Sequence, residues 1–183
     1  AKLGEHFDII ESIGVLHHMD DPSVGWAVLT ELLGPSGLMK IGLYSELARK
    51  DIVTIREEIA ALGLQGCESE IRDFRHQIAQ STKSHHKQLT LSKDFFSLSE
   101  LRDAIFHIQE HRFTIPQLAQ RLESLNLQFC GFTPSELNHE LDLYYNGQAD
   151  RHNLNAWHQF EVDHPDTFRG MYQFWCQKVA YTQ

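Results

Sequence analysis

Three residues with metal-binding and proton-transfer chemistry, His107, Glu110 and His111, have the spacing H-x-x-E-H. On one helix, two His residues at i and i+4 share a face and can bind zinc, while the Glu acts as a general base. The segment approaches a helix end, because Thr114 begins new helix-start chemistry. A third protein ligand would also be needed, with candidates at Glu136, Glu140 and Glu161. With 12 histidines in the chain, a chance match is easy. A zinc hydrolase is therefore the weakest hypothesis, and no metal ligand is assigned.

The cysteines and the C-terminal aromatic residues favour packing over chemistry. Cys67, Cys130 and Cys176 are odd in number and form no C-x-x-C pair, which argues against a disulfide framework and favours a reducing cytoplasm. Cys130 and Cys176 fall in expected strands as small apolar residues. The aromatic residues are best explained as core; they are Trp157, Phe160, Phe168, Tyr172, Phe174 and Trp175.

Length, composition and charge limit the class of protein. The 183 residues, 42% hydrophobic and 22% charged, suit one globular domain. A net charge of -9 excludes nucleic acid as a bulk partner and disfavours an anionic membrane. No apolar run reaches the ~18–20 residues of a membrane span, and no export signal opens the chain.

The beginning of the chain predicts a βαβ unit. Residues 7–16 form an apolar strand, and Asp21 with Pro22 supplies helix-start chemistry. The helix should end at the turn 34–37, and residues 38–44 form the next strand. Strands joined in this way are parallel, so the fold class is α/β.

The rest of the chain predicts helices and two more strands. Helical stripes follow residue 44, and the polar stretch 80–93 reads as a mobile loop. Ser97 with Glu100, and Thr114 with Gln117, fit capping boxes. Strands are then expected at 127–132 and 171–179, with helices at 134–145 and 153–164 between them. The total is about four strands.

Three consecutive segments carry a recognisable pattern: FDIIESIGVLHHMDDP at 7–22, GPSG at 34–37 and LMKIGLY at 38–44. They resemble the second half of class I S-adenosylmethionine-dependent methyltransferases, where such a passage joins the fourth strand to the fifth. The segments at 42–49, 96–118 and 171–178 are similar to a subgroup often fused to tetratricopeptide repeats.

The resemblance implies a partial Rossmann-like methyltransferase sheet. The strand order would be fourth, fifth, seventh, sixth, with the seventh antiparallel. Residues 1–183 would form a single domain, the C-terminal part of the fold, with residues 45–126 as a helical insertion or lid. No Gly-x-Gly occurs in the chain, so the glycine-rich turn that approaches the cofactor is missing. We therefore expect a fragment of an enzyme that is inactive alone.

Matching positions of the family imply that Ser12, Ile13, Gly14 and His17 line S-adenosylmethionine. Ligands of open α/β sheets bind beyond the carboxyl ends of the strands, and a glycine there permits close backbone approach. The alternative is that Gly14 eases a bend and that the two histidines are a polar strand end.

The acceptor side of the expected site draws on two regions. His18 and Tyr44 are positioned to face a substrate and are the catalytic candidates, although Tyr44 also suits a strand end as an amphipathic residue. The insertion would contribute substrate-binding residues, namely His107, Glu110, His111 and Arg112. The methyl acceptor stays open among a protein, a small metabolite and a sugar.

The first strand raises the question of a partner. In the family it would pair with a strand that this chain lacks, which leaves an apolar edge. We expect a homodimer through residues 7–16. The rival to the methyltransferase hypothesis is a non-enzymatic interaction domain without the cofactor half.

Overall fold

A computed structural model describes residues 4–106 and 109–179. The chain divides into two compact units: residues 1–48 with 110–183, here the sheet unit, and residues 49–109, here the helical unit. Each unit has its own hydrophobic core. The part of the chain described contains no helix long and apolar enough to cross a bilayer.

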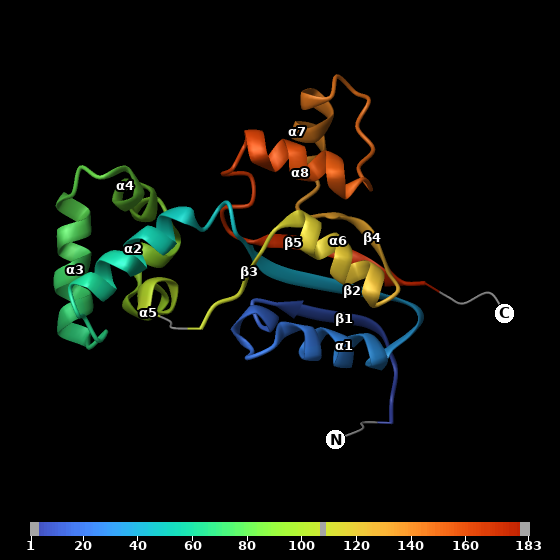
Figure 1. The fold of residues 1–183 in the computed structure, drawn as a ribbon, viewed down its shortest axis with the longest axis horizontal. Coiled ribbons are helices and arrows are strands. Elements are labelled where there is room, and N and C mark those ends of the chain that lie inside the picture. Colours follow the sequence, from blue (N-terminus) through green and yellow to red (C-terminus); the bar gives the residue numbers. More distant parts are fainter. Residues whose placement is uncertain (1–3, 107–108, 180–183) are drawn as a thin grey trace. The chain divides into compact units, whose positions relative to one another are not determined.

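The sheet unit is an α/β fold around a mixed sheet of five strands. The strands are β1 (Phe7–Ile13), β2 (Leu33–Ser45), β3 (Arg112–Phe113), β4 (Leu127–Phe132) and β5 (Tyr172–Lys178). Their order is β1-β2-β5-β4, and the short β3 pairs with β2 (Figure 1). β1 and β2 are parallel, whereas β5 runs antiparallel to both of its neighbours. The expected order and the antiparallel last strand are confirmed, and β3 is an addition that sequence patterns did not indicate.

One face of this sheet is buried under helices. Met39, Ile41 and Leu43 alternate along β2 and are fully buried. They share a core with Trp26 of α1 (Pro22–Leu32) and with Leu118 of α6 (Ile115–Ser124). The core also takes in α7 (Glu136–Tyr144) and α8 (Leu154–Asp163). The C-terminal aromatic residues pack here as expected, except that Trp175 is only half-buried.

The opposite face of β1 and β2 is open. Ile9 pairs with Leu38 across the two strands, and both side chains are exposed. Lys40 pairs with Trp175, with its ammonium 5.9 Å from the indole centroid. Parallel strands are normally covered on both faces, so this face lacks a layer within the described residues.

The helical unit folds around a second core. Its elements are α2 (Lys50–Ala61), α3 (Glu68–Gln80), α4 (Ser84–Thr90), a 3-10 turn at Lys93–Phe96 and α5 (Leu98–Phe106). Ile55 of α2, Phe74 of α3 and Leu101 of α5 meet in the centre.

Several expected boundaries were wrong. The stretch 80–93, interpreted as a mobile loop, contains α4, because His86 and Leu89 lie one turn apart and both are buried. The first strand ends at Ile13, not at residue 16, because Gly14 takes φ +74° and turns the chain. The turn at 34–37 is the irregular start of β2.

The helical unit is also narrower than the insertion expected at 45–126. α6 follows this unit, and its Leu118 and Leu122 pack in the core of the sheet unit. The helical unit therefore begins after Ala48 and ends at Gln109.

Candidate functional site

The candidate site lies where the parallel strands β1 and β2 end. The Gly14 amide donates to the Gly42 carbonyl at 3.3 Å, which fixes the turn leaving β1. No atom lies within 4 Å of the position that a Cβ on Gly14 would take, so its backbone faces open space. A ligand can approach the main chain here without meeting a side chain.

Ser12 and Ile13 flank this turn but face different sides of the sheet. Ser12 is buried toward the covered face, and Ile13 is exposed on the open face. The two side chains therefore cannot line the same cavity. Only the backbone of Ser12 and Ile13 can therefore form a common surface with the backbone of Gly14 at the end of β1.

Three ring side chains gather next to Gly14. His17 belongs to the 3-10 turn Leu16–His18 and is fully buried. Its ring stacks on that of Tyr44, with centroids 4.0 Å apart and planes at 27°. His18 meets His17 edge-on, with centroids 4.4 Å apart. The structure thus brings together His17, His18 and Tyr44, which the sequence places in two separate segments.

The short strand β3 and the residue before it add Arg112 and His111 to this site. Arg112 pairs with Tyr44 in the β2–β3 register, and the His111 amide donates to the His17 carbonyl at 2.8 Å. The Arg112 Nε lies 3.2 Å from the Glu46 carboxylate. Glu110, with its side chain almost fully buried, reaches Arg112 at 3.8 Å. His107, the fourth expected substrate residue, lies outside the described residues.

A cavity of about 720 Å³ opens beside His111 and Arg112. The start of α1 and one side of α6 form its walls. Its lining is mostly polar, comprising Asp20, Asp21, Pro22, Ser23, His111, Arg112, Phe113, Gln117, Gln120, Arg121 and Ser124. Two arginines and two aspartates give it both charges, which suits a polar or zwitterionic ligand.

The two aspartates of the cavity lining, Asp20 and Asp21, lie directly before α1. The Asp21 carboxylate accepts from the Ser23 amide at 2.8 Å as the helix cap, and this hydrogen bond lowers the pKa of Asp21. Arg121 of α6 donates to the Ser23 hydroxyl at 2.5 Å. The Asp21 carboxylate in the cavity lining is therefore ionised at neutral pH.

A buried polar network at the end of β2 was not predicted, because the sequence offered Glu161 only as a possible zinc ligand and Tyr172 only as a core residue. Ser45 donates to Glu161 at 2.5 Å, and Tyr172 donates to the same carboxylate at 2.6 and 2.7 Å. All three side chains are fully buried. Burial raises the pKa of Glu161 against the opposing effect of these two hydroxyls, and burial also raises the pKa of Tyr172. The available signal was the position of Glu161, which shares the apolar stripe of α8 with Trp157 and Phe160.

The zinc-hydrolase hypothesis fails on geometry. It requires Glu110 and His111 to lie on a helix that also carries His107. α5 ends at Phe106, and residues 109–111 have no helical structure. The H-x-x-E-H spacing is therefore not presented on one helix face.

Comparison with known proteins supports the fold. No family model matches the chain. Two structures of PKMT2, a protein lysine methyltransferase from Rickettsia typhi, superpose with TM-scores of 0.64 and 0.61 at 14% and 16% identity, and the second holds AdoHcy. They cover 96% and 94% of this chain but 36% and 35% of theirs. The fold is thus structurally like part of a methyltransferase.

One curated relative is closer in sequence. Uncharacterized protein syc1184_c from Synechococcus sp. is 32% identical over 142 residues, which is 73% of this chain and 34% of that protein. The chain therefore spans about a third of the length of the proteins it matches.

Proposed function

We propose that this chain is part of an S-adenosylmethionine-dependent methyltransferase and supplies one wall of its cofactor site. The observation that carries the proposal is the grouping of Gly14, His17 and Tyr44 at the carboxyl ends of β1 and β2. In open α/β sheets this is the edge at which ligands bind. The backbone of Ser12, Ile13 and Gly14 contacts the cofactor, and the fully buried His17 supports this wall from behind through its stacking on Tyr44.

The open backbone at Gly14 fits such a ligand, since a flat or extended group can lie against the main chain there. S-adenosylmethionine supplies the methyl group, and the protein aligns the acceptor with it. His18 and Tyr44 face the acceptor from the ring cluster. His111 and Arg112 line the polar cavity through which the acceptor enters.

The open face of β1 and β2 supports the proposal that a further part of the protein completes the site. β1 is the outer strand, and Phe7, Ile9 and Ile13 are exposed along it. Chains that match this one are about three times as long, which leaves ample length for a second layer and for a glycine-rich turn. When the 183-residue chain is prepared alone, the same edge pairs with a second copy.

Calorimetric titration with AdoHcy tests this function. The samples are the 183-residue chain and the longest protein encoded in frame with it. We expect binding by the longer protein and weak or no binding by the chain alone. If no protein containing this chain binds AdoHcy, the methyltransferase proposal fails and the interaction-domain hypothesis replaces it.

A further inference from the structure

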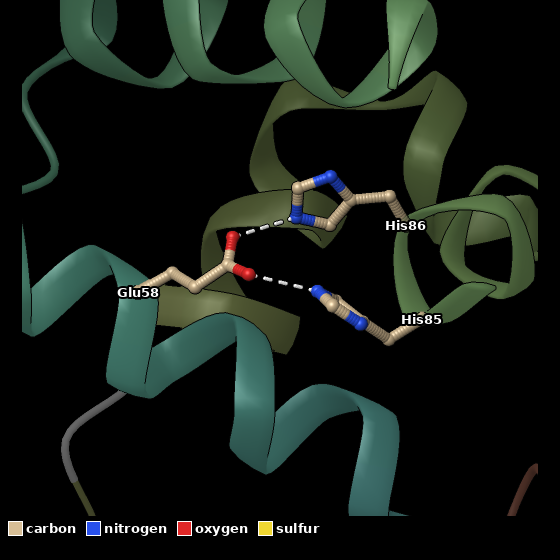
Figure 2. A group of neighbouring side chains, drawn as sticks. All are labelled: Glu58, His85 and His86. Atoms are coloured by element: carbon tan, nitrogen blue, oxygen red, sulfur yellow. Dashed lines mark hydrogen bonds and ion pairs between the residues drawn. The ribbon is translucent and has the colours of Figure 1, made fainter. Parts of the chain in front are cut away.

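A cluster in the helical unit has the composition of a metal site and lies outside the proposed cofactor site. Glu58 comes from α2, and His85 and His86 come from the first turn of α4. Figure 2 shows the three side chains pointing toward one another. Their ligand atoms all lie within 4.8 Å of each other.

Each oxygen of the Glu58 carboxylate faces one imidazole. His85 Nε2 lies 2.8 Å from one oxygen, and His86 Nε2 lies 2.8 Å from the other. Ligand atoms around tetrahedral zinc, at bond lengths of about 2.0–2.1 Å, are about 3.3 Å apart. Each Glu58–imidazole distance would therefore lengthen by about half an ångström when the ion enters, and the other ligand atoms, all within 4.8 Å of one another, would close toward about 3.3 Å.

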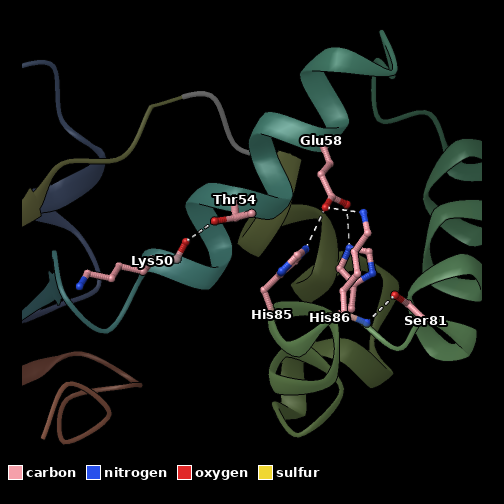
Figure 3. A network of polar contacts seen from close by, with 7 residues as sticks. Lys50, Thr54, Glu58, Ser81, His85 and His86 are labelled. Atoms are coloured by element: carbon pink, nitrogen blue, oxygen red, sulfur yellow. Dashed lines mark hydrogen bonds and ion pairs between the residues drawn. The ribbon is translucent and has the colours of Figure 1, made fainter.

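The cluster is held by packed helices. Glu58 stands between Ile55 and Ile59, which anchor α2 in the core of the helical unit. His86 is buried, and its ring meets that of Phe74 edge-on at 6.2 Å. The Ser81 hydroxyl accepts a hydrogen bond from the Lys83 amide at 3.2 Å, which orders the turn before α4. Figure 3 shows Ser81 near His86. The ligand atoms thus converge before any ion binds.

A cationic side chain already takes part in this cluster. Lys83 Nζ lies 2.7 Å from Glu58, and its side chain is 55% exposed, against 23% for Glu58 and 6% for His86. An exposed lysine can swing into solvent when a dication takes its place beside the carboxylate. Burial lowers the pKa of His86, which favours the neutral ring that a metal requires.

We propose that Glu58, His85 and His86 form a zinc site that clamps α4 onto α2. Two imidazoles and one carboxylate are ligands that zinc accepts, and the partly exposed side of Glu58 leaves the fourth position to water. Lys83 competes with the ion for the carboxylate.

Zinc titration of the chelator-treated protein tests the site, with a chromophoric chelator as competitor. We expect one zinc ion per chain and an increase in melting temperature of the helical unit. E58Q and H85Q should each weaken zinc binding at least tenfold. K83M should tighten it severalfold, because the competing ammonium is gone. The matched control is H76Q, which removes an exposed histidine of α3 and should leave the affinity unchanged.

Absence of stoichiometric zinc in the wild-type protein overturns the proposal, and so does equal weakening by H76Q. An unchanged affinity in E58Q and H85Q, or weaker binding in K83M, also overturns it. Circular dichroism establishes that each variant is folded. If a histidine variant does not fold, the proposal is tested by adding cobalt(II) to the wild-type protein. Tetrahedral coordination gives an intense visible absorption, whereas octahedral binding at the surface does not, and a weak absorption overturns the proposal. AdoHcy plays no part in these measurements, so their failure is distinct from failure of the proposed function.

Discussion

The imidazole of His17 stacks on the phenol ring of Tyr44, with centroids 4.0 Å apart, where β1 and β2 end. The two residues are far apart in sequence and belong to different strand ends. The His111 amide also donates a hydrogen bond to the His17 carbonyl. These two contacts join three segments of the chain, around His17, Tyr44 and His111, into one surface. This surface is the proposed boundary between cofactor and acceptor.

The stacked pair leads to a prediction for Tyr44. Y44F preserves a ring against His17, whereas Y44L does not. Aromatic pairs contribute about 0.5–1.5 kcal/mol beyond the area they bury. We expect Y44L to be less stable than Y44F by about 1 kcal/mol in urea unfolding, and to bind AdoHcy more weakly in the longer protein. Equal stability of the two variants would show that stacking does not hold this surface together.

Comparison of Gly14 with Gly63 separates the effect of backbone strain on stability from the effect on AdoHcy binding. Gly14 has φ +74°, and Gly63 of the helical unit has φ +66°, also with no atom within 4 Å of a Cβ. G14A and G63A should each lower the free energy of unfolding by about 1 kcal/mol, because a side chain disfavours this conformation. Only G14A should weaken AdoHcy binding by the longer protein. Equal AdoHcy affinity in the two variants would remove Gly14 from the cofactor site.

Glu161 should make the stability of the sheet unit depend on pH. Its folded-state pKa is raised by burial above the ordinary value of 4.5, so the protonated form is favoured in the folded protein. The stability is then complete below pH 4.5 and declines as pH rises from there through the folded-state pKa. Chemical denaturation between pH 4 and about 8 should show this decline in the wild type and a flatter profile in E161Q.

The Glu161 carboxylate accepts hydrogen bonds from two buried hydroxyl groups, those of Ser45 and Tyr172. E161Q keeps an amide oxygen for Ser45 and Tyr172, whereas E161A leaves both without an acceptor. We expect E161A to be destabilised by about 3 kcal/mol at neutral pH, and E161Q by much less. If E161A and E161Q unfold at the same denaturant concentration, the hydroxyl network contributes little to stability.

The edge of β1 should govern self-association of the isolated chain. I9K places a charge on the open edge strand and should shift a sedimentation profile from dimer to monomer. L143K is the matched control, because Leu143 is exposed on α7 and should leave the dimer intact. A wild-type chain that sediments as a monomer at every concentration would contradict the dimer.

Local patterns determined most elements of the sheet unit. The strand at 127–132 and the capping box of Thr114 with Gln117 were predictable, because alternation and helix caps depend on residues close in sequence. The order β1-β2-β5-β4 was predictable from the family resemblance. α4 was missed because six of its seven residues are polar, and such a short segment forms a helix only when His86 and Leu89 can pack into a core.

The sequence by itself named His17, His18, Tyr44, His111 and Arg112 as candidates, and the tertiary structure decided that they meet. It also decided that Ser45, Glu161 and Tyr172 share one buried network, and that Glu58 meets His85 and His86. Helix and strand patterns record only which residues face a core. Contacts between residues tens of positions apart depend on how the elements pack, and no local pattern in the chain encodes that packing.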